Sequence, residues 1–192
     1  MRTQTIQTVL KPLSDAPNQV YLGIGVHTLG LLGWILEQID GPADVAVTTF
    51  STSEEFLSGF LNLRRKNFIS HATMVADLKA SKKTVKLKDL MGMCFEEVYL
   101  ASNHSKILLV HGANTLISVV SSQNNTYGGR AECTYITTDT EIYYELSKQL
   151  GLLIKDSVKI DGVHARTTEA DRAAGSKADS GFGDFRPFGA AD

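Results

Sequence analysis

Polar side chains stand at the open end of an apolar hairpin in NHSKILLVHGANTLISVVSSQN, residues 103–124. His104 and Lys106 precede the first apolar run, and strand alternation places them on one face with Ser105 on the other. If the turn centres on Gly112-Ala113, the numbers of antiparallel partners sum to about 225. We therefore expect His104 to lie opposite Ser121 at the mouth of the hairpin.

The residue types at this mouth suit a phosphoryl group. The imidazole of His104 is a nucleophile or proton carrier near neutral pH. The ammonium of Lys106 supplies positive charge, and the amide of Asn124 supplies donors, for a group whose charge grows in the transition state. An isolated H-x-K is common in strands, and Ser-Ser-Gln-Asn is ordinary turn chemistry. The joint arrangement is what indicates a phosphate site.

The elements that must position these residues alternate between strands and helices. A capping box, Thr52-x-x-Glu55, opens one helix, and Gly151 is expected to end the last one. The periodicities predict helices over 27–39, 53–66, 84–92 and 141–150, and strands over 44–50, 68–78, 97–102 and 133–139 in addition to the hairpin. This order predicts an α/β fold, a mixed β-sheet flanked by helices in a single domain.

Composition divides the chain into three parts. Residues 1–19 are polar and contain two prolines, which predicts an irregular or edge segment. Residues 20–163 form the expected domain. Residues 164–192 are rich in Ala, Gly, Ser and Asp, which predicts a disordered tail, with a docking peptide as the alternative because the last eleven residues, FGDFRPFGAAD, include three aromatic residues.

The charge is nearly balanced overall but uneven along the chain. The formal net charge is −2, and apolar residues make up 43% of the sequence, as in an ordinary soluble protein. Residues 61–110 contain nine basic residues and four acidic ones. Eight of these cations are the candidate nucleic-acid-binding residues: Arg64, Arg65, Lys66, Lys79, Lys82, Lys83, Lys86 and Lys88. A solvated helix face is the alternative explanation for this block.

The apolar segments and the cysteines of the sequence indicate where the protein is located. There is no signal peptide pattern, and the apolar run over 20–36 falls short of a membrane span. Cys94 and Cys133 have no metal-ligand spacing and are more typical of small buried residues than of nucleophiles. We expect a cytoplasmic protein with reduced thiols that does not bind a membrane. His27 opens a helix as a capping neighbour, and His71 is expected to pack in a strand.

The motif residues resemble a known signature. His104-x-Lys106, the run Ser121-Ser122-Gln123-Asn124 and then Glu132 are similar to the H-x-K…G-S-x-N…E pattern of the phospholipase D superfamily, in its single-motif, nuclease-like branch. The resemblance covers about residues 20–155. His111 stands where the pattern has aspartate, and Ser121 stands where it has glycine. Members of this branch dimerise so that two motifs form one active site.

The resemblance implies a role for each motif residue. His104 would be the nucleophile that forms a phosphohistidine, and His104 of a second copy the general acid. Lys106 and Asn124 would bind the non-bridging phosphate oxygens, and Ser122 would line the same pocket. Glu132 would accept a hydrogen bond from the imidazole and orient it. The resemblance implies no metal and no cofactor.

We therefore expect a metal-independent phosphodiesterase, a nuclease that acts as a homodimer on nucleic acid, DNA rather than RNA. The basic block favours a polyanion over a lipid. A catalytically inactive nucleic-acid-binding or assembly module is the alternative. A phospholipase or other small-diester hydrolase is a third hypothesis.

Overall fold

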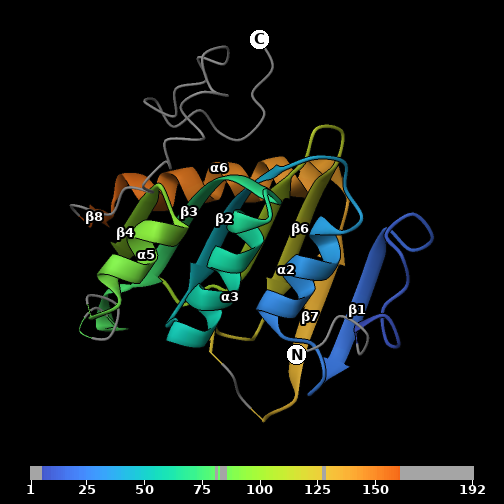
Figure 1. Cartoon of the computed structure of the whole chain (residues 1–192), viewed down its shortest axis with the longest axis horizontal. Coiled ribbons are helices and arrows are strands. Elements are labelled where there is room, and N and C mark those ends of the chain that lie inside the picture. The colour runs from blue at the N-terminus through green and yellow to red at the C-terminus, as the bar shows by residue number, and fades with distance from the viewer. Residues whose placement is uncertain (1–5, 81, 83–85, 127–128, 161–192) are drawn as a thin grey trace.

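A computed structural model describes residues 6–80, 82, 86–126 and 129–160, in which strands and helices alternate (Figure 1). The strands are β1 (Asn18–Gly23), β2 (Ala43–Thr49), β3 (Ile69–Asp77), β4 (Glu97–Ala101), β5 (Ile107–His111), β6 (Leu116–Ser121), β7 (Glu132–Thr137) and β8 (Val158–Lys159). The helices are α2 (Thr28–Leu36), α3 (Glu54–Arg65), α5 (Lys88–Cys94) and α6 (Thr140–Lys155), with a 3-10 turn, η1 (Leu78–Ala80). The predicted α/β class is confirmed.

The described strands form one mixed sheet. Its eight strands run in the order β1-β7-β6-β5-β2-β3-β4-β8. The central strands β2, β3 and β4 are parallel, and the remaining neighbours are antiparallel. Parallel neighbours need a crossover, and α3 and α5 supply it. The carboxyl ends of β2, β3 and β4 therefore meet along one edge of the sheet, here called the carboxyl edge.

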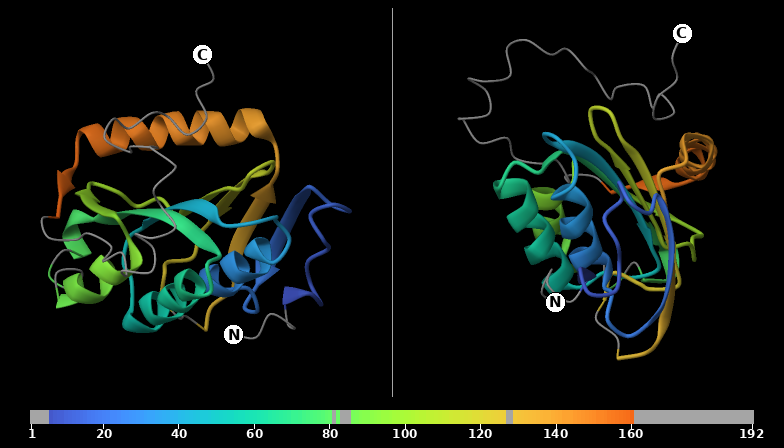
Figure 2. Two further views of the ribbon diagram at one scale, coloured as in Figure 1. Left: turned by 45° about the horizontal axis from the view of Figure 1, so that its top comes forward. Right: turned by 90° about the vertical axis from the view of Figure 1, so that its right-hand side faces the viewer.

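Helices cover both faces of the sheet, as the edge-on view shows (Figure 2). The helices α2, α3 and α5 lie on one face and bury the larger core. It includes Trp34, Phe60 and Phe95 with alternate residues of two central strands, Val45 and Val47 of β2 and Leu108 and Val110 of β5. The helix α6 crosses the other face and buries Tyr143. None of the helices in the described part of the chain has the length and apolar character needed to cross a bilayer.

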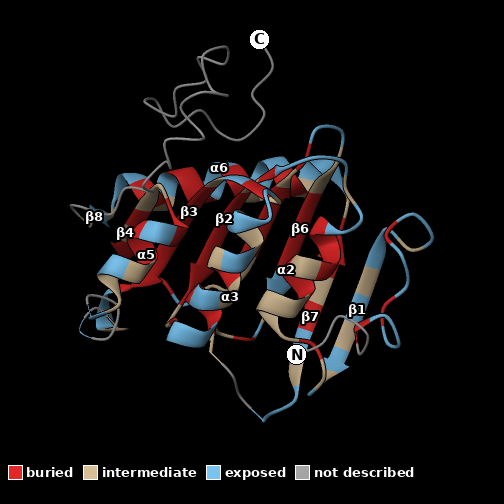
Figure 3. Ribbon diagram, viewed as in Figure 1, coloured by how far each residue is buried: buried red, intermediate tan, exposed pale blue. Residues whose placement is uncertain are grey.

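The strand β1 forms an exposed edge of the sheet. It pairs with β7 and is exposed along much of its length (Figure 3). Val20 and Leu22 are 69% and 75% exposed, whereas Tyr21 packs against the larger core. Ahead of this strand, three apolar side chains are buried in the same core: Ile6, Leu10 and Leu13. The polar amino-terminal region thus contributes both an edge strand and core residues.

Several helix boundaries differ from the prediction, such as that of α2, which ends at Leu36, and two of the differences have a clear physical cause. Ser53, not Thr52, caps α3, because its hydroxyl accepts a hydrogen bond from Phe56 N–H at 3.2 Å. The helix α6 continues four residues beyond Gly151, since Leu150 and Ile154 are buried against the sheet and their burial outweighs the low helix propensity of glycine. The expected tail over 164–192 lies outside the described residues.

Candidate active site

The candidate site lies at the carboxyl edge. The strand β5 begins beside the end of β2, and β6 ends where β7 begins, because these strands run antiparallel to their neighbours. His104, Lys106, Ser122, Asn124 and Glu132 occupy the segments that border these strand ends. The topology therefore brings together all the motif residues that the sequence singles out.

The hairpin register differs from the expected one by two residues. Partners sum to 227, as in Ile107 opposite Val120, and the backbone N–H of Ser121 donates to the carbonyl of Lys106 at 2.9 Å. Lys106, not His104, thus lies opposite Ser121. The turn lies one residue later than expected, since Gly112 N–H bonds to the carbonyl of Thr115 at 2.9 Å and leaves Ala113 and Asn114 between them. His104 precedes the strand and needs another means of support.

Asn103 provides that support from beneath the segment. Its side chain, 4% exposed, accepts hydrogen bonds from the N–H and hydroxyl of Ser105 at 2.9 and 2.5 Å. Its amide donates to the carbonyls of Thr49 and Val75 at the ends of β2 and β3. Its backbone N–H donates to the buried carboxylate of Asp77 at 2.9 Å. The backbone on both sides of His104 is thereby tied to the sheet.

The side chains of His104 and Lys106 contact one another. The Lys106 ammonium lies 3.0 Å from Nδ1 of His104 and donates to the His104 carbonyl at 2.6 Å. The ring of Phe50 lies 5.3 Å from the imidazole, centroid to centroid. An ammonium can only donate, so Nδ1 accepts here, and a neutral ring in this arrangement carries its proton on Nε2.

Glu132 has a different partner from the expected one. Its carboxylate accepts a hydrogen bond from the hydroxyl of Ser122, which in turn accepts from Cys133 N–H at 3.0 Å. Glu132 still acts on the site through its charge. Burial lowers the pKa of Lys106, and the carboxylates of Glu132 and Asp77 partly oppose that effect. The carboxylates of Glu132 and Asp77 therefore favour the charged form of Lys106 in this site.

The run after β6 is held by amide contacts. Asn124 Oδ1 accepts from Phe50 N–H at 3.2 Å. The buried side chain of Gln123 accepts from Thr28 N–H at 2.8 Å, and its amide nitrogen lies 3.1 Å from Nδ1 of His27. This run therefore joins the start of α2 to the end of β2.

The predicted basic block is split by the fold. Because α3 returns the chain from the end of β2 to the start of β3, its last turn lies at the opposite edge from His104. Arg64, Arg65 and Lys66 belong to that distant end. The cations after β3 begin on the carboxyl-edge side. Lys79, Lys82 and Lys86 are exposed there, Lys88 begins α5, and Lys83 lies outside the described residues.

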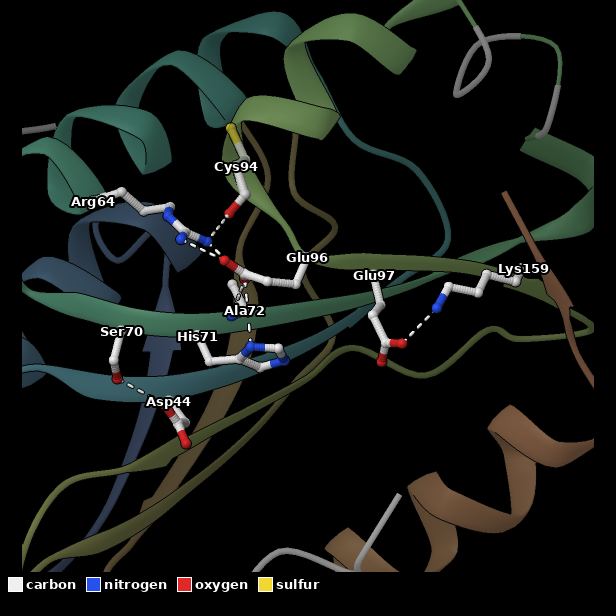
Figure 4. Close-up of polar contacts among 9 residues, drawn as sticks. All are labelled: Asp44, Arg64, Ser70, His71, Ala72, Cys94, Glu96, Glu97 and Lys159. Carbon is white, nitrogen blue, oxygen red and sulfur yellow. Dashed lines mark hydrogen bonds and ion pairs between the residues drawn. The ribbon is translucent and has the colours of Figure 1, made fainter. Parts of the chain in front are cut away.

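Arg64 has a structural partner at its end of the sheet. Its guanidinium forms a two-point contact with the carboxylate of Glu96, at 2.7 and 2.5 Å, and donates to the carbonyl of Cys94 at 2.8 Å (Figure 4). Glu96 also accepts from Ala72 N–H at 2.7 Å. The two side chains are 16% and 26% exposed. We therefore assign Arg64 to the packing of α3 against the sheet.

Several residues of the site were missed in the sequence. Asn103 and Asp77 support His104, and His27 lies beside the motif through Gln123. The position of Asn103 directly before the motif was an available signal. No sequence signal indicates the contact between His27 and Gln123, because they are 96 residues apart.

Comparison with known proteins rests on structure. No protein-family model matches the chain, and no curated protein matches its sequence. The fold is similar to Nuc from Salmonella typhimurium, a phospholipase D family member, with a TM-score of 0.56 and 12% identity over 74% of this chain and 98% of that one. It is also similar to NucT from Helicobacter pylori, with a TM-score of 0.57 and 13% identity over 74% of this chain and 98% of that one.

Larger proteins contain a similar unit. Polyphosphate kinase from Porphyromonas gingivalis matches with a TM-score of 0.58 and 14% identity, over 77% of this chain but 29% of the kinase. TrmBL2, an archaeal chromatin protein, matches with a TM-score of 0.51 and 12% identity, over 82% of this chain and 59% of that protein. At these identities the likeness concerns the fold. The chain has the α/β fold of phospholipase D superfamily members, and it spans almost the full length of the single-domain proteins Nuc and NucT.

Proposed function

We propose that this protein is a metal-independent phosphodiesterase that cleaves nucleic acid through a phosphohistidine at His104, in a site shared by two copies of the chain. The observation that carries the proposal is the direct contact of His104 and Lys106 beside Ser122 and Glu132 at the carboxyl edge. This set combines a nucleophile, a cation and a nearby carboxylate. The fold shared with Nuc and NucT supports the same class of function.

The first chemical step transfers the phosphoryl group to the protein. Nε2 of His104 attacks phosphorus, the bond to the leaving oxygen breaks, and that oxygen takes a proton from His104 of the second copy. Lys106 and Asn124 hold the non-bridging oxygens, on which charge grows. In the second step, water attacks the phosphohistidine and gives its proton to the second imidazole. The P–N bond then breaks, and both histidines return to their starting states.

Substrate binding must first change the proton position on His104. The contact of Lys106 with Nδ1 leaves the proton on Nε2, which is the attacking atom. A phosphodiester anion would draw the ammonium away, since the two are oppositely charged. Nδ1 is then able to carry the proton and donate it to Glu132, once that carboxylate turns from Ser122. We propose that this exchange of partners accompanies substrate binding.

The test is cleavage of DNA in the presence of a chelator. The wild-type chain should cleave in EDTA, and His104→Ala should lose all measurable activity. His111→Asn is the matched control, because His111 lies at the far end of β5, the strand that His104 precedes. Mass spectrometry of a quenched reaction should find a phosphoryl adduct on His104. Activity that requires a divalent metal, or that survives His104→Ala, refutes the mechanism.

A second candidate is a nucleic-acid-binding or assembly module without catalysis. A Lys106 ammonium that stays on Nδ1 favours it, because the neutral ring then keeps its proton on Nε2, the attacking nitrogen. A fold shared with TrmBL2, whose reported structure concerns DNA binding, also supports it. This candidate predicts binding that weakens as salt rises, without cleavage. The distance between the two His104 side chains in a dimer separates the candidates, because a shared site requires them within a few ångströms.

A further inference from the structure

A pocket opens beside the candidate phosphate site, between the first turns of α2 and α3. These helices lie side by side on one face of the sheet (Figure 1). Three short segments line the pocket: His27–Gly30, Ser53 with Glu55–Phe56, and Gln123–Thr126. Asn124 belongs both to this lining and to the proposed phosphate site. A group attached to a phosphate at Asn124 would therefore reach the pocket directly.

The walls of the pocket combine apolar surface with amides. Leu29 and Phe56 line it with hydrocarbon, and Phe56 belongs to the larger core. The side chain of Asn125 also lines it and is 3% exposed. Its amide nitrogen has no hydrogen-bond partner among the described residues. A buried donor without a partner is costly, so a ligand acceptor at this position would be favoured.

The charges around the pocket disfavour a second phosphate. The carboxylate of Glu55 lines the opening, and an anion there would be repelled. Burial lowers the pKa of His27, although Glu55 opposes the effect, so the imidazole acts near neutral pH as a hydrogen-bonding group and not as a cation. An uncharged planar ring with polar edges meets these conditions.

We infer that this pocket is a subsite for the nucleobase next to the scissile phosphate. The inference rests on the proposed function and narrows its substrate to strands with unpaired bases, because a base inside a duplex cannot enter a pocket. Leu29 and Phe56 contact the ring, Asn125 donates to it, and Glu55 accepts from its edge. Guanine presents two adjacent N–H donors to a carboxylate, whereas thymine flanks its single N–H with carbonyl oxygens. The subsite therefore favours guanine over thymine.

Base removal tests the subsite. Single-stranded oligonucleotides with a guanine, a thymine or an abasic residue beside one cleavable phosphodiester are compared by kcat/KM. The guanine substrate should exceed the abasic one by about tenfold or more, a typical effect of losing one base contact. Glu55→Gln should lower the preference for guanine over thymine by about tenfold or more, near the contribution of one charged hydrogen bond. Glu54→Gln is the matched control, since Glu54 is the adjacent exposed carboxylate and does not line the pocket.

Two further probes separate this inference from the proposed function. Bis(p-nitrophenyl) phosphate has no N–H donor for Glu55, so its cleavage tests the chemistry without the contact that distinguishes guanine from thymine. If neither this diester nor DNA is cleaved, the proposed function fails, and binding of dGMP against 2-deoxyribose 5-phosphate tests the pocket by itself. Tighter binding of dGMP, weakened in Glu55→Gln, supports the subsite. Equal cleavage of guanine and abasic substrates, or equal binding of the two monophosphates, overturns it.

Discussion

The ion pair between Arg64 and Glu96 should stabilise the fold measurably, and breaking it provides a test of the role assigned to Arg64. Two unit charges about 4 Å apart at an effective dielectric constant near 20 attract by about 4 kcal/mol. Desolvation and side-chain ordering reduce this value. With the side chains 16% and 26% exposed, we expect a coupling free energy of about 2 kcal/mol.

The assay is a double-mutant cycle of Arg64→Met and Glu96→Gln, followed by urea unfolding and thermal melting. Each single variant should lower Tm by about 4–8 °C, since 1 kcal/mol corresponds to about 2–4 °C in a domain of this size. The pair Glu97 and Lys159 is the control (Figure 4), because Lys159 is 43% exposed and its coupling should stay below about 1 kcal/mol. Coupling below about 0.5 kcal/mol for Arg64 and Glu96 refutes the structural role.

The same variants address nucleic-acid binding. If Arg64 serves packing, Arg64→Met should leave the salt dependence of oligonucleotide binding unchanged. Lys79→Met should reduce the slope of log K against log salt by about 1, because Lys79 is exposed on the carboxyl-edge side. If Arg64→Met reduces the slope of log K against log salt and leaves the free energy of unfolding unchanged, Arg64 contacts nucleic acid and does not serve packing.

Three further outcomes are expected from single sites. Because burial lowers the pKa of Lys106, its ammonium is lost at a lower pH than in an ordinary lysine, so kcat/KM should fall before pH reaches about 10.4. Lys106→Arg should move this fall in kcat/KM to higher pH, because arginine stays protonated. If the fall occurs at the same pH in the variant, it does not come from Lys106. Burial also raises the pKa of Cys94 to about 12. A thiol reagent at pH 8 should therefore modify only the exposed Cys133 while the chain is folded. Equal rates of modification at Cys94 and Cys133 would contradict the burial of Cys94. Asn103→Ala removes two hydrogen bonds from Ser105 and two to the carbonyls of Thr49 and Val75, which should cost about 2–4 kcal/mol in urea unfolding and lower kcat/KM. Stability lost with activity kept would separate Asn103 from the positioning of His104.

Local patterns in the sequence were sufficient for the type and order of most elements. Apolar periodicity over 44–50 and 68–78 predicted β2 and β3, and the capping box expected at Thr52 predicted α3, which Ser53 caps. The spacing of His104 and Lys106 from Asn124 predicted a polar hairpin mouth, because an antiparallel hairpin always brings its two ends together. These conclusions depend on contacts between residues close in sequence, which is why they needed no tertiary information.

Contacts between distant residues decided the rest. The strand β1 exists because Asn18 pairs with Thr137, and the register of the hairpin shifted by two because its turn spans Gly112 to Thr115. The helix α6 passes Gly151 because the sheet buries the residues on either side of it.

The sequence by itself determined the α/β class, the mixed sheet and the residues that gather at the hairpin mouth. Only the tertiary structure decided which of them contact one another and which cations share their edge. Lys106 reaches His104, Glu132 holds Ser122, and the crossover through α3 carries Arg64 to the opposite end of the sheet. The physical reason is that hydrogen-bond partners and ion pairs depend on side-chain positions within a few ångströms, and packing over the whole sheet sets those positions.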